Sequence, residues 1–133
     1  MSEAPEIENV RYDTAAPVMD REQIDSLLMA DDEEEANSLA RELFTLYETE
    51  SREKLAGLDR ICRERDGDAL RKLVHFIAGS AGNLGLERLS AFYRGIEQAI
   101  DDGVLDDFEA CARLIPREFE LSCEGFCKAL DLD

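Results

Sequence analysis

The spacing of apolar residues along the chain predicts helices and no strands. From residue 20 onward, apolar side chains recur at intervals of three and four residues, the spacing of one face of an α-helix. No stretch shows the period of two that is typical of a half-buried strand. The expected helices cover 20–28, about 31 to 65, 69–82, 86–100 and 107–131. The apolar stripe of the second comprises Leu39, Leu43, Leu46, Tyr47, Leu55, Leu58 and Cys62.

Polar and glycine-rich breaks separate these helices. The sequence at 66–68 matches a helix stop and restart, with Gly67 as a left-handed residue and Asp68 as the next N-cap. Residues 82–85 form a turn between two helices, and Pro116 either kinks the last helix or begins a new one. Four amphipathic helices joined by short turns predict an all-α fold: an antiparallel up-down four-helix bundle with a short extra N-terminal helix.

The composition is that of one globular domain behind a polar segment. The 133 residues are 44% apolar and 35% charged, which suits a compact domain with its own core. Residues 1–18 mix acidic and polar side chains with two prolines, so we expect a flexible acidic leader before a helical domain over 19–133. No apolar run approaches the ~20 residues of a membrane span, and no secretory signal is present. We expect a cytoplasmic protein with no membrane partner, and a helical bundle that is self-sufficient as a monomer.

Charge and cysteine content argue against several classes of function. The net charge of −17 disfavours nucleic acid as a partner. The four cysteines form no CxxC, and one histidine cannot complete a Cys/His site, so we expect no metal and no cofactor. All four fall on or beside apolar stripes, which disfavours a thiol-based redox sensor. Residues 60–94 differ from the rest, with seven basic side chains against four acidic ones.

The single histidine, His75, lies in the expected helix 69–82. On a helical wheel with Leu70 at zero, the apolar face spans roughly −60° to +40°, whereas His75 lies at about 140°. The imidazole is therefore expected on the outer face of the bundle. The wheel places no Asp or Glu beside it, and a convex helical face is a poor acid–base or metal site. A nucleophile presented to another macromolecule is the remaining interpretation.

The neighbours of His75 on this face are two cations and nearly bare backbone. They are Arg71, Lys72, Ala78, Gly79 and Gly82. The cations would stabilise an anionic group on the ring, and the glycines would let a partner approach closely. Phe76 lies at about 240°, where its ring either belongs to a docking surface or packs against a neighbouring helix.

The segment around the histidine resembles the signature of histidine-containing phosphotransfer (HPt) domains. The family pattern is H-x-L-K-G-S/A-x-x-x-[hydrophobic]-G, followed by a helix that ends near a hydrophobic-Glu pair. The matching residues are His75, Gly79, Ser80, Leu84 and Gly85, then Leu89 and Ile96-Glu97. The similarity is sharpest over 70–97 and extends more loosely from about 20 to 131. One departure is Ala78, which stands where the family usually has a lysine that helps to hold the phosphoryl group.

The resemblance implies a phosphocarrier of a two-component phosphorelay and not an enzyme. His75 would be the phosphoacceptor, exchanging a phosphoryl group with an aspartate of a response-regulator receiver domain, which would bind the Mg²⁺. A hybrid histidine kinase would be a further partner. Arg71 or Lys72 would supply the charge that is missing at Ala78. The alternative is a phosphorylation-silent HPt-like adaptor or inhibitor that binds receivers or kinases, which Ala78 and an exposed Phe76 favour.

Overall fold

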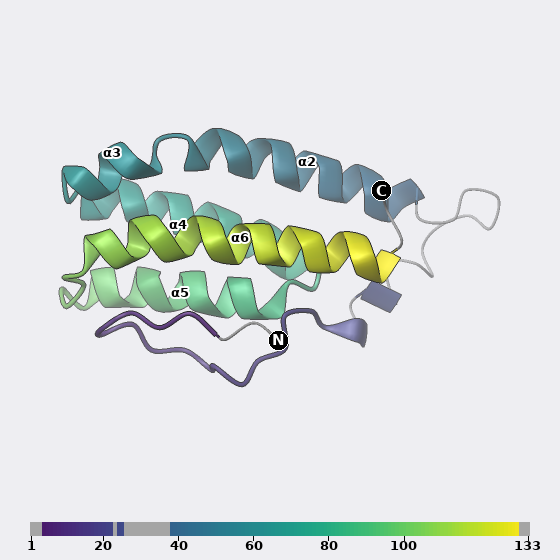
Figure 1. Cartoon of the computed structure of the whole chain (residues 1–133), viewed down its shortest axis with the longest axis horizontal. Helices are drawn as coiled ribbons and strands as arrows, with labels where there is room; N and C mark the ends of the chain where they lie inside the picture. The colour runs from purple at the N-terminus through teal and green to yellow at the C-terminus, as the bar shows by residue number, and fades with distance from the viewer. Residues whose placement is uncertain (1–3, 23, 26–37, 131–133) are drawn as a thin grey trace.

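All regular secondary structure in the described part of the chain is helical (Figure 1). The computed structural model describes residues 4–22, 24–25 and 38–130, without the side chains of 38, 39 and 130. No strand occurs in this part, so the all-α prediction is confirmed. The helices are α2 (Ser38–Leu55), α3 (Leu58–Arg63), α4 (Gly67–Asn83), α5 (Glu87–Asp101) and α6 (Phe108–Leu130). Of the predicted helix at 20–28, residues 21, 22, 24 and 25 are helical, and the rest lies outside the described residues.

The helices form an up-down bundle around one hydrophobic core. α2 and α3 together make the first arm, and α4, α5 and α6 follow in alternating directions (Figure 1). α4 and α5 make the most extensive interhelical contact. The largest fully buried side chains are aromatic: Phe92, Tyr93, Phe119 and Phe126. Burial of each ring contributes about 1.5–3 kcal/mol relative to an exposed ring.

The first arm differs from its prediction in two ways. The helix expected over about 31–65 is interrupted, because Gly57 ends one segment and caps α3. Two residues of the expected stripe, Leu43 and Leu46, are 37% and 58% exposed. Three members of that stripe are buried as expected: Tyr47, Leu58 and Cys62. The other buried residues of α2 are Ala40, Phe44 and Ser51, so its buried face lies one residue further along the chain than Leu43 and Leu46.

The start of α4 also lies closer to the preceding helix than the sequence indicated. Asp66, not Asp68, is the N-cap, and its side chain accepts a hydrogen bond from the Ala69 amide. The left-handed residue is Arg65, with a φ of 53°, so Gly67 is simply the first residue of the helix. The last helix, α6, runs unbroken across Pro116, so the second of the two expectations for that proline is wrong.

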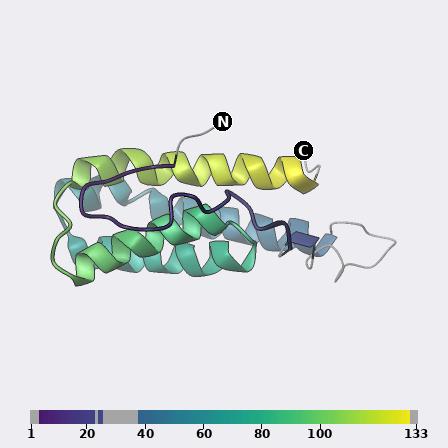
Figure 2. The ribbon, with the colours of Figure 1, turned by 90° about the horizontal axis from the view of Figure 1, so that it is seen from below.

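The N-terminal segment (residues 4–19) has a defined path along α5 and α6, where a flexible leader was expected (Figure 2). Ile7 is buried, and the Tyr12 ring lies 5.3 Å from that of Phe92 on α5. The chain passes so close to α5 that a Cβ atom on Gly95 would lie 2.7 Å from the Arg11 carbonyl oxygen. The close packing of this segment against α5 therefore requires a residue without a Cβ atom at position 95.

A buried ion pair links α5 to α6. The Arg88 guanidinium donates two hydrogen bonds of 2.9 Å to the Glu118 carboxylate, and the two side chains are only 6% and 1% exposed. The fold tolerates the burial of these two charged side chains because they form a bidentate pair, with two parallel charge-assisted hydrogen bonds. Loss of either one leaves the other charge buried without its counter-ion.

We predict that Glu118→Ala lowers the free energy of unfolding by about 3–5 kcal/mol, because Arg88 keeps its charge in a buried site. Urea denaturation measures this change. Glu64→Ala is the matched control, since it breaks the exposed pair with Arg60 and should cost about 0.5 kcal/mol or less. Equal losses in the two variants would contradict the prediction.

We predict that Gly95→Ala displaces the N-terminal segment and lowers the free energy of unfolding by about 1–3 kcal/mol, because the new methyl group overlaps the Arg11 carbonyl. Limited proteolysis within 4–19 should become faster. Gly57→Ala is the control, because its nearest neighbour would be an ordinary contact at 3.9 Å. Unchanged proteolysis in Gly95→Ala would show that the segment does not depend on this approach.

Candidate functional site

His75 lies on the outer face of α4, as the helical wheel predicts. Its side chain is 61% exposed, while Val74 and Ile77 beside it are buried in the core. The difference follows from helical geometry, since a step of one residue turns the side chain by about 100°. The ring is therefore held on a rigid element with one side open to solvent.

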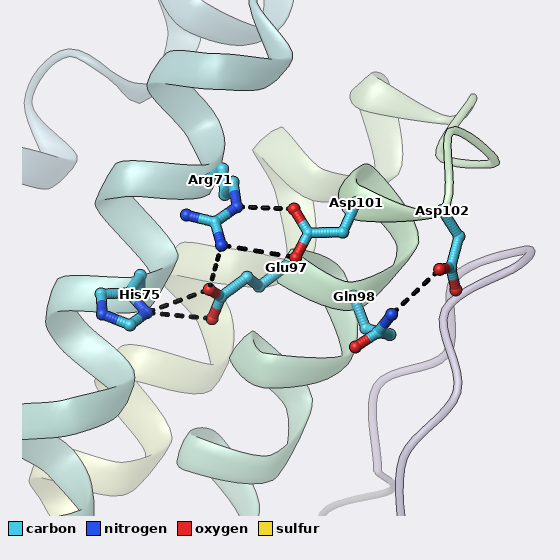
Figure 3. Close-up of polar contacts among 6 residues, drawn as sticks. All are labelled: Arg71, His75, Glu97, Gln98, Asp101 and Asp102. Atoms are coloured by element: carbon cyan, nitrogen blue, oxygen red, sulfur yellow. Dashed lines mark hydrogen bonds and ion pairs between the residues drawn. The ribbon is translucent and has the colours of Figure 1, made fainter.

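A carboxylate from the neighbouring helix contacts the ring. Both oxygens of Glu97, on α5, lie 3.0 and 3.1 Å from Nδ1 of His75 (Figure 3). The wheel of α4 alone showed no acidic neighbour, because Glu97 comes from a different helix. Its side chain is only 14% exposed, so water competes little for this hydrogen bond.

The contact determines which nitrogen is free. A carboxylate only accepts hydrogen bonds, so the contact assigns the ring proton to Nδ1, which donates a hydrogen bond to Glu97. In the neutral ring, Nε2 then has the lone pair. No described residue forms a hydrogen bond with Nε2, which points away from Glu97 in Figure 3. Glu97 thus orients the imidazole and leaves its nucleophilic nitrogen accessible.

The first cation predicted beside the histidine, Arg71, is engaged in ion pairs. Its guanidinium contacts Glu97 at 3.1 Å and Asp101 at 2.6 Å (Figure 3). The hydrogen bond from Arg71 lowers the pKa of the Asp101 carboxyl. Arg71 therefore helps to position Glu97. Lys72 forms an exposed ion pair with Asp68, one turn earlier on α4.

Three other residues predicted on this face differ in exposure. Ala78 is completely buried, which corrects its predicted place on the outer face, because α5 covers this side of α4. Gly79 is half-buried with no atom within 4 Å of a potential Cβ, and Gly82 is exposed. Backbone near the histidine is thus accessible at the two glycines.

Phe76 is half-buried and belongs partly to the bundle. Its ring packs against the core, and the Lys54 ammonium on α2 lies 4.3 Å from the ring centroid. Of the two readings left open by the sequence, packing against a neighbouring helix describes this side chain.

Other chemistries have little support in the described residues. Burial raises the pKa of Cys62 to about 11 and those of Cys111 and Cys123 to about 12, so these thiols are not reactive thiolates near neutral pH. The described part contains no group of three His, Cys, Asp or Glu side chains placed to bind a metal ion. None of its helices has the length and apolar character of a transmembrane span.

The all-helical bundle agrees with the result of comparison with known families. The family model described as Hpt domain matches residues 42–125, which is most of the chain. The chain belongs to the Hpt domain family. No curated protein and no solved structure gives a significant match. Hpt domains serve as phosphocarriers in phosphorelays, where they interact with receiver domains and kinases.

Sequence reasoning missed the part of this candidate site that comes from α5. The positions of these residues in the sequence indicate the pairing. His75 lies eleven residues before Leu86 and Glu97 eleven after it. Arg71 lies fifteen residues before Leu86 and Asp101 fifteen after it. In an antiparallel helical hairpin, residues at equal distances from the turn face each other. A polar stripe on the second helix therefore indicates the partners of the first.

We predict that Glu97→Ala removes the preference for a proton on Nδ1 of His75, because the acceptor that holds it is lost. Long-range ¹H–¹⁵N NMR of the neutral ring should show Nδ1–H as the dominant tautomer in the native chain and a shift towards Nε2–H in the variant. Gln98→Ala is the control, since Gln98 bonds to Asp102 and not to the histidine. The same tautomer in native and Glu97→Ala chains would disprove the orienting role.

Proposed function

We propose that this Hpt domain carries a phosphoryl group on Nε2 of His75, to or from the aspartate of a response-regulator receiver domain. The observation that supports the proposal most directly is the Glu97 contact with Nδ1, which leaves Nε2 as the exposed lone pair. Membership of the Hpt family supports histidine phosphotransfer in general, and the geometry favours this one atom. A cytoplasmic location, a hybrid histidine kinase as partner and a monomeric state belong to the same proposal.

The transfer needs little chemistry from this chain. The Nε2 lone pair attacks the phosphorus of an aspartyl phosphate, the bond from phosphorus to the carboxylate oxygen breaks, and the receiver regains its carboxylate. The proton on Nδ1 stays in place, and Glu97 stabilises the positive charge that the ring gains. The reverse step returns the phosphoryl group to the carboxylate. Phosphoryl transfer depends mainly on positioning and charge stabilisation, and Mg²⁺ bound by the receiver would supply part of the charge.

Close approach of the receiver is supported by the backbone next to the histidine. Gly79 follows His75 by four residues, on the same side of α4, and has open space where a side chain would begin. A glycine inside a helix costs roughly 1 kcal/mol relative to alanine, so its presence on an open helix surface indicates that bare backbone is useful there.

The second candidate is a phosphorylation-silent adaptor or inhibitor that binds receivers or kinases. The observation that favours it is Ala78: the usual lysine is absent, and a buried alanine presents no charge to a phosphoryl group. The two candidates differ in one measurable property, namely whether a covalent phosphoryl group forms on His75.

We predict that a phosphorylated receiver with Mg²⁺ labels the native chain and that His75→Ala abolishes the label. The experiment tests the purified chain against the ³²P-labelled receivers of the source organism. Acid-labile, alkali-stable label is the signature of phosphohistidine. His75→Gln serves as a second variant of similar size, with the fold checked by circular dichroism.

Two outcomes would count against the phosphocarrier. Stable receiver binding without label in the native chain would establish the adaptor instead. Label that persists in His75→Ala would place the phosphoryl group on another residue.

A further inference from the structure

We infer that Arg94, on α5, is the cation that binds the phosphoryl group carried by His75. This inference rests on the proposed function and names a residue of the same site. It follows from three features of the α4–α5 hairpin: the register of the two helices, the hydrogen bonds around Ser90, and the occupation of the other nearby cations.

The register places Arg94 on the part of α5 that lies beside Ala78. Two ion pairs join residues at equal distances from Leu86, His75 with Glu97 and Arg71 with Asp101, and a Cβ atom on Gly82 would lie 3.5 Å from the Ser90 oxygen. Two further contacts, Ser90 with Ala78 and Arg71 with Glu97, are offset by one turn. Ala78 and Arg94 are each eight residues from Leu86, between the Gly82–Ser90 contact and the His75–Glu97 pair. Arg94 therefore belongs to the position on α5 that faces the turn of α4 immediately after His75.

Hydrogen bonds hold Arg94 at the junction of the two helices. The Ser90 hydroxyl donates to the Ala78 carbonyl oxygen at 3.0 Å, and Nε of Arg94 donates to the Ser90 oxygen at 3.3 Å. Arg94 itself is exposed. Its bond to Ser90 uses one donor of a group that has five, so the terminal nitrogens remain available to an anion.

The other candidate cations near His75 are less suitable. Arg71 is bound to two carboxylates, Glu97 and Asp101, and its charge already supports the orientation of the histidine. Lys72 is paired with Asp68. Arg94 has no ion pair with any of the described residues, and a serine hydroxyl is a weak competitor for a phosphoryl dianion.

The Arg94 side chain extends towards Ser90, which lies one turn nearer Leu86 and therefore away from His75. Contact with a phosphoryl group on His75 requires this side chain to turn back past Ala78, which is three residues from His75, about 4.5 Å along the helix axis at a rise of ~1.5 Å per residue. In the family pattern a lysine at this position extends from α4 itself. Here the charge would come across the junction from α5, and a guanidinium is suited to bidentate binding of phosphoryl oxygens.

The test uses phosphoramidate, a small donor that needs no partner protein. Nε2 of His75 attacks its phosphorus, the P–N bond breaks, and ammonia leaves with a proton from solvent. Phosphorylation is followed by ³¹P NMR in the native chain and in Arg94→Ala, Arg94→Lys and His75→Ala. Arg113→Ala is the matched control, because it removes an exposed arginine from α6. Thermal unfolding verifies that the variants remain folded.

We expect Arg94→Ala to slow phosphorylation of His75 about tenfold or more, because it removes a charge-assisted hydrogen bond to the phosphoryl group. Arg94→Lys should recover most of the rate, and Arg113→Ala should match the native chain. The side-chain Nε–H signal of Arg94 should shift when His75 is phosphorylated, which a purely structural role would not produce.

The outcomes separate this inference from the proposed function. Phosphorylation of His75 at the native rate in Arg94→Ala, with an unmoved Arg94 signal, overturns the role of Arg94 and leaves the phosphocarrier intact. A native chain that takes no phosphoryl group on His75, from phosphoramidate or from any receiver, overturns both.

Discussion

The register between α4 and α5 is the constraint on which the site depends. It is set by a short turn through Gly85, whose φ of 77° is a conformation that glycine adopts without steric cost. Buried side chains on both helices, such as Ile77 and Ile96, keep the register once it has formed. A slip of one residue would rotate the facing side chains by about 100°, and Glu97 would no longer contact His75. The packing of buried side chains between α4 and α5 thus determines the orientation of the His75 imidazole on the surface.

Much of the fold could be predicted because amphipathic helices reveal their period in the sequence. The exceptions have physical reasons. In α2, the stripes that contain Leu43 and Phe44 are one residue apart, and periodicity does not choose between them. The aromatic face is buried because Phe44 stacks on Phe126, with ring centroids 4.9 Å apart. The N-terminal segment has no period to detect, since it is held by single side chains such as Ile7.

The site could be predicted only as far as one helix determines it. The position of His75 on the outer face follows from α4 alone. The contact with Glu97 and the burial of Ala78 depend on how α5 packs against α4. A helical wheel of α4 alone gives no information about that packing. Ala78 lies at about 80° on that wheel, just beyond the predicted apolar face, and α5 widens the buried sector to include it.

The burial of Ala78 also limits how this site is able to evolve. A lysine at that position needs space that α5 now fills, and overpacking of this kind typically costs about 1–3 kcal/mol. A single substitution towards the common family sequence would therefore weaken the hairpin before it improved the chemistry. Restoring that lysine requires a compensating change on α5, where the Ser90 side chain lies against the Ala78 backbone.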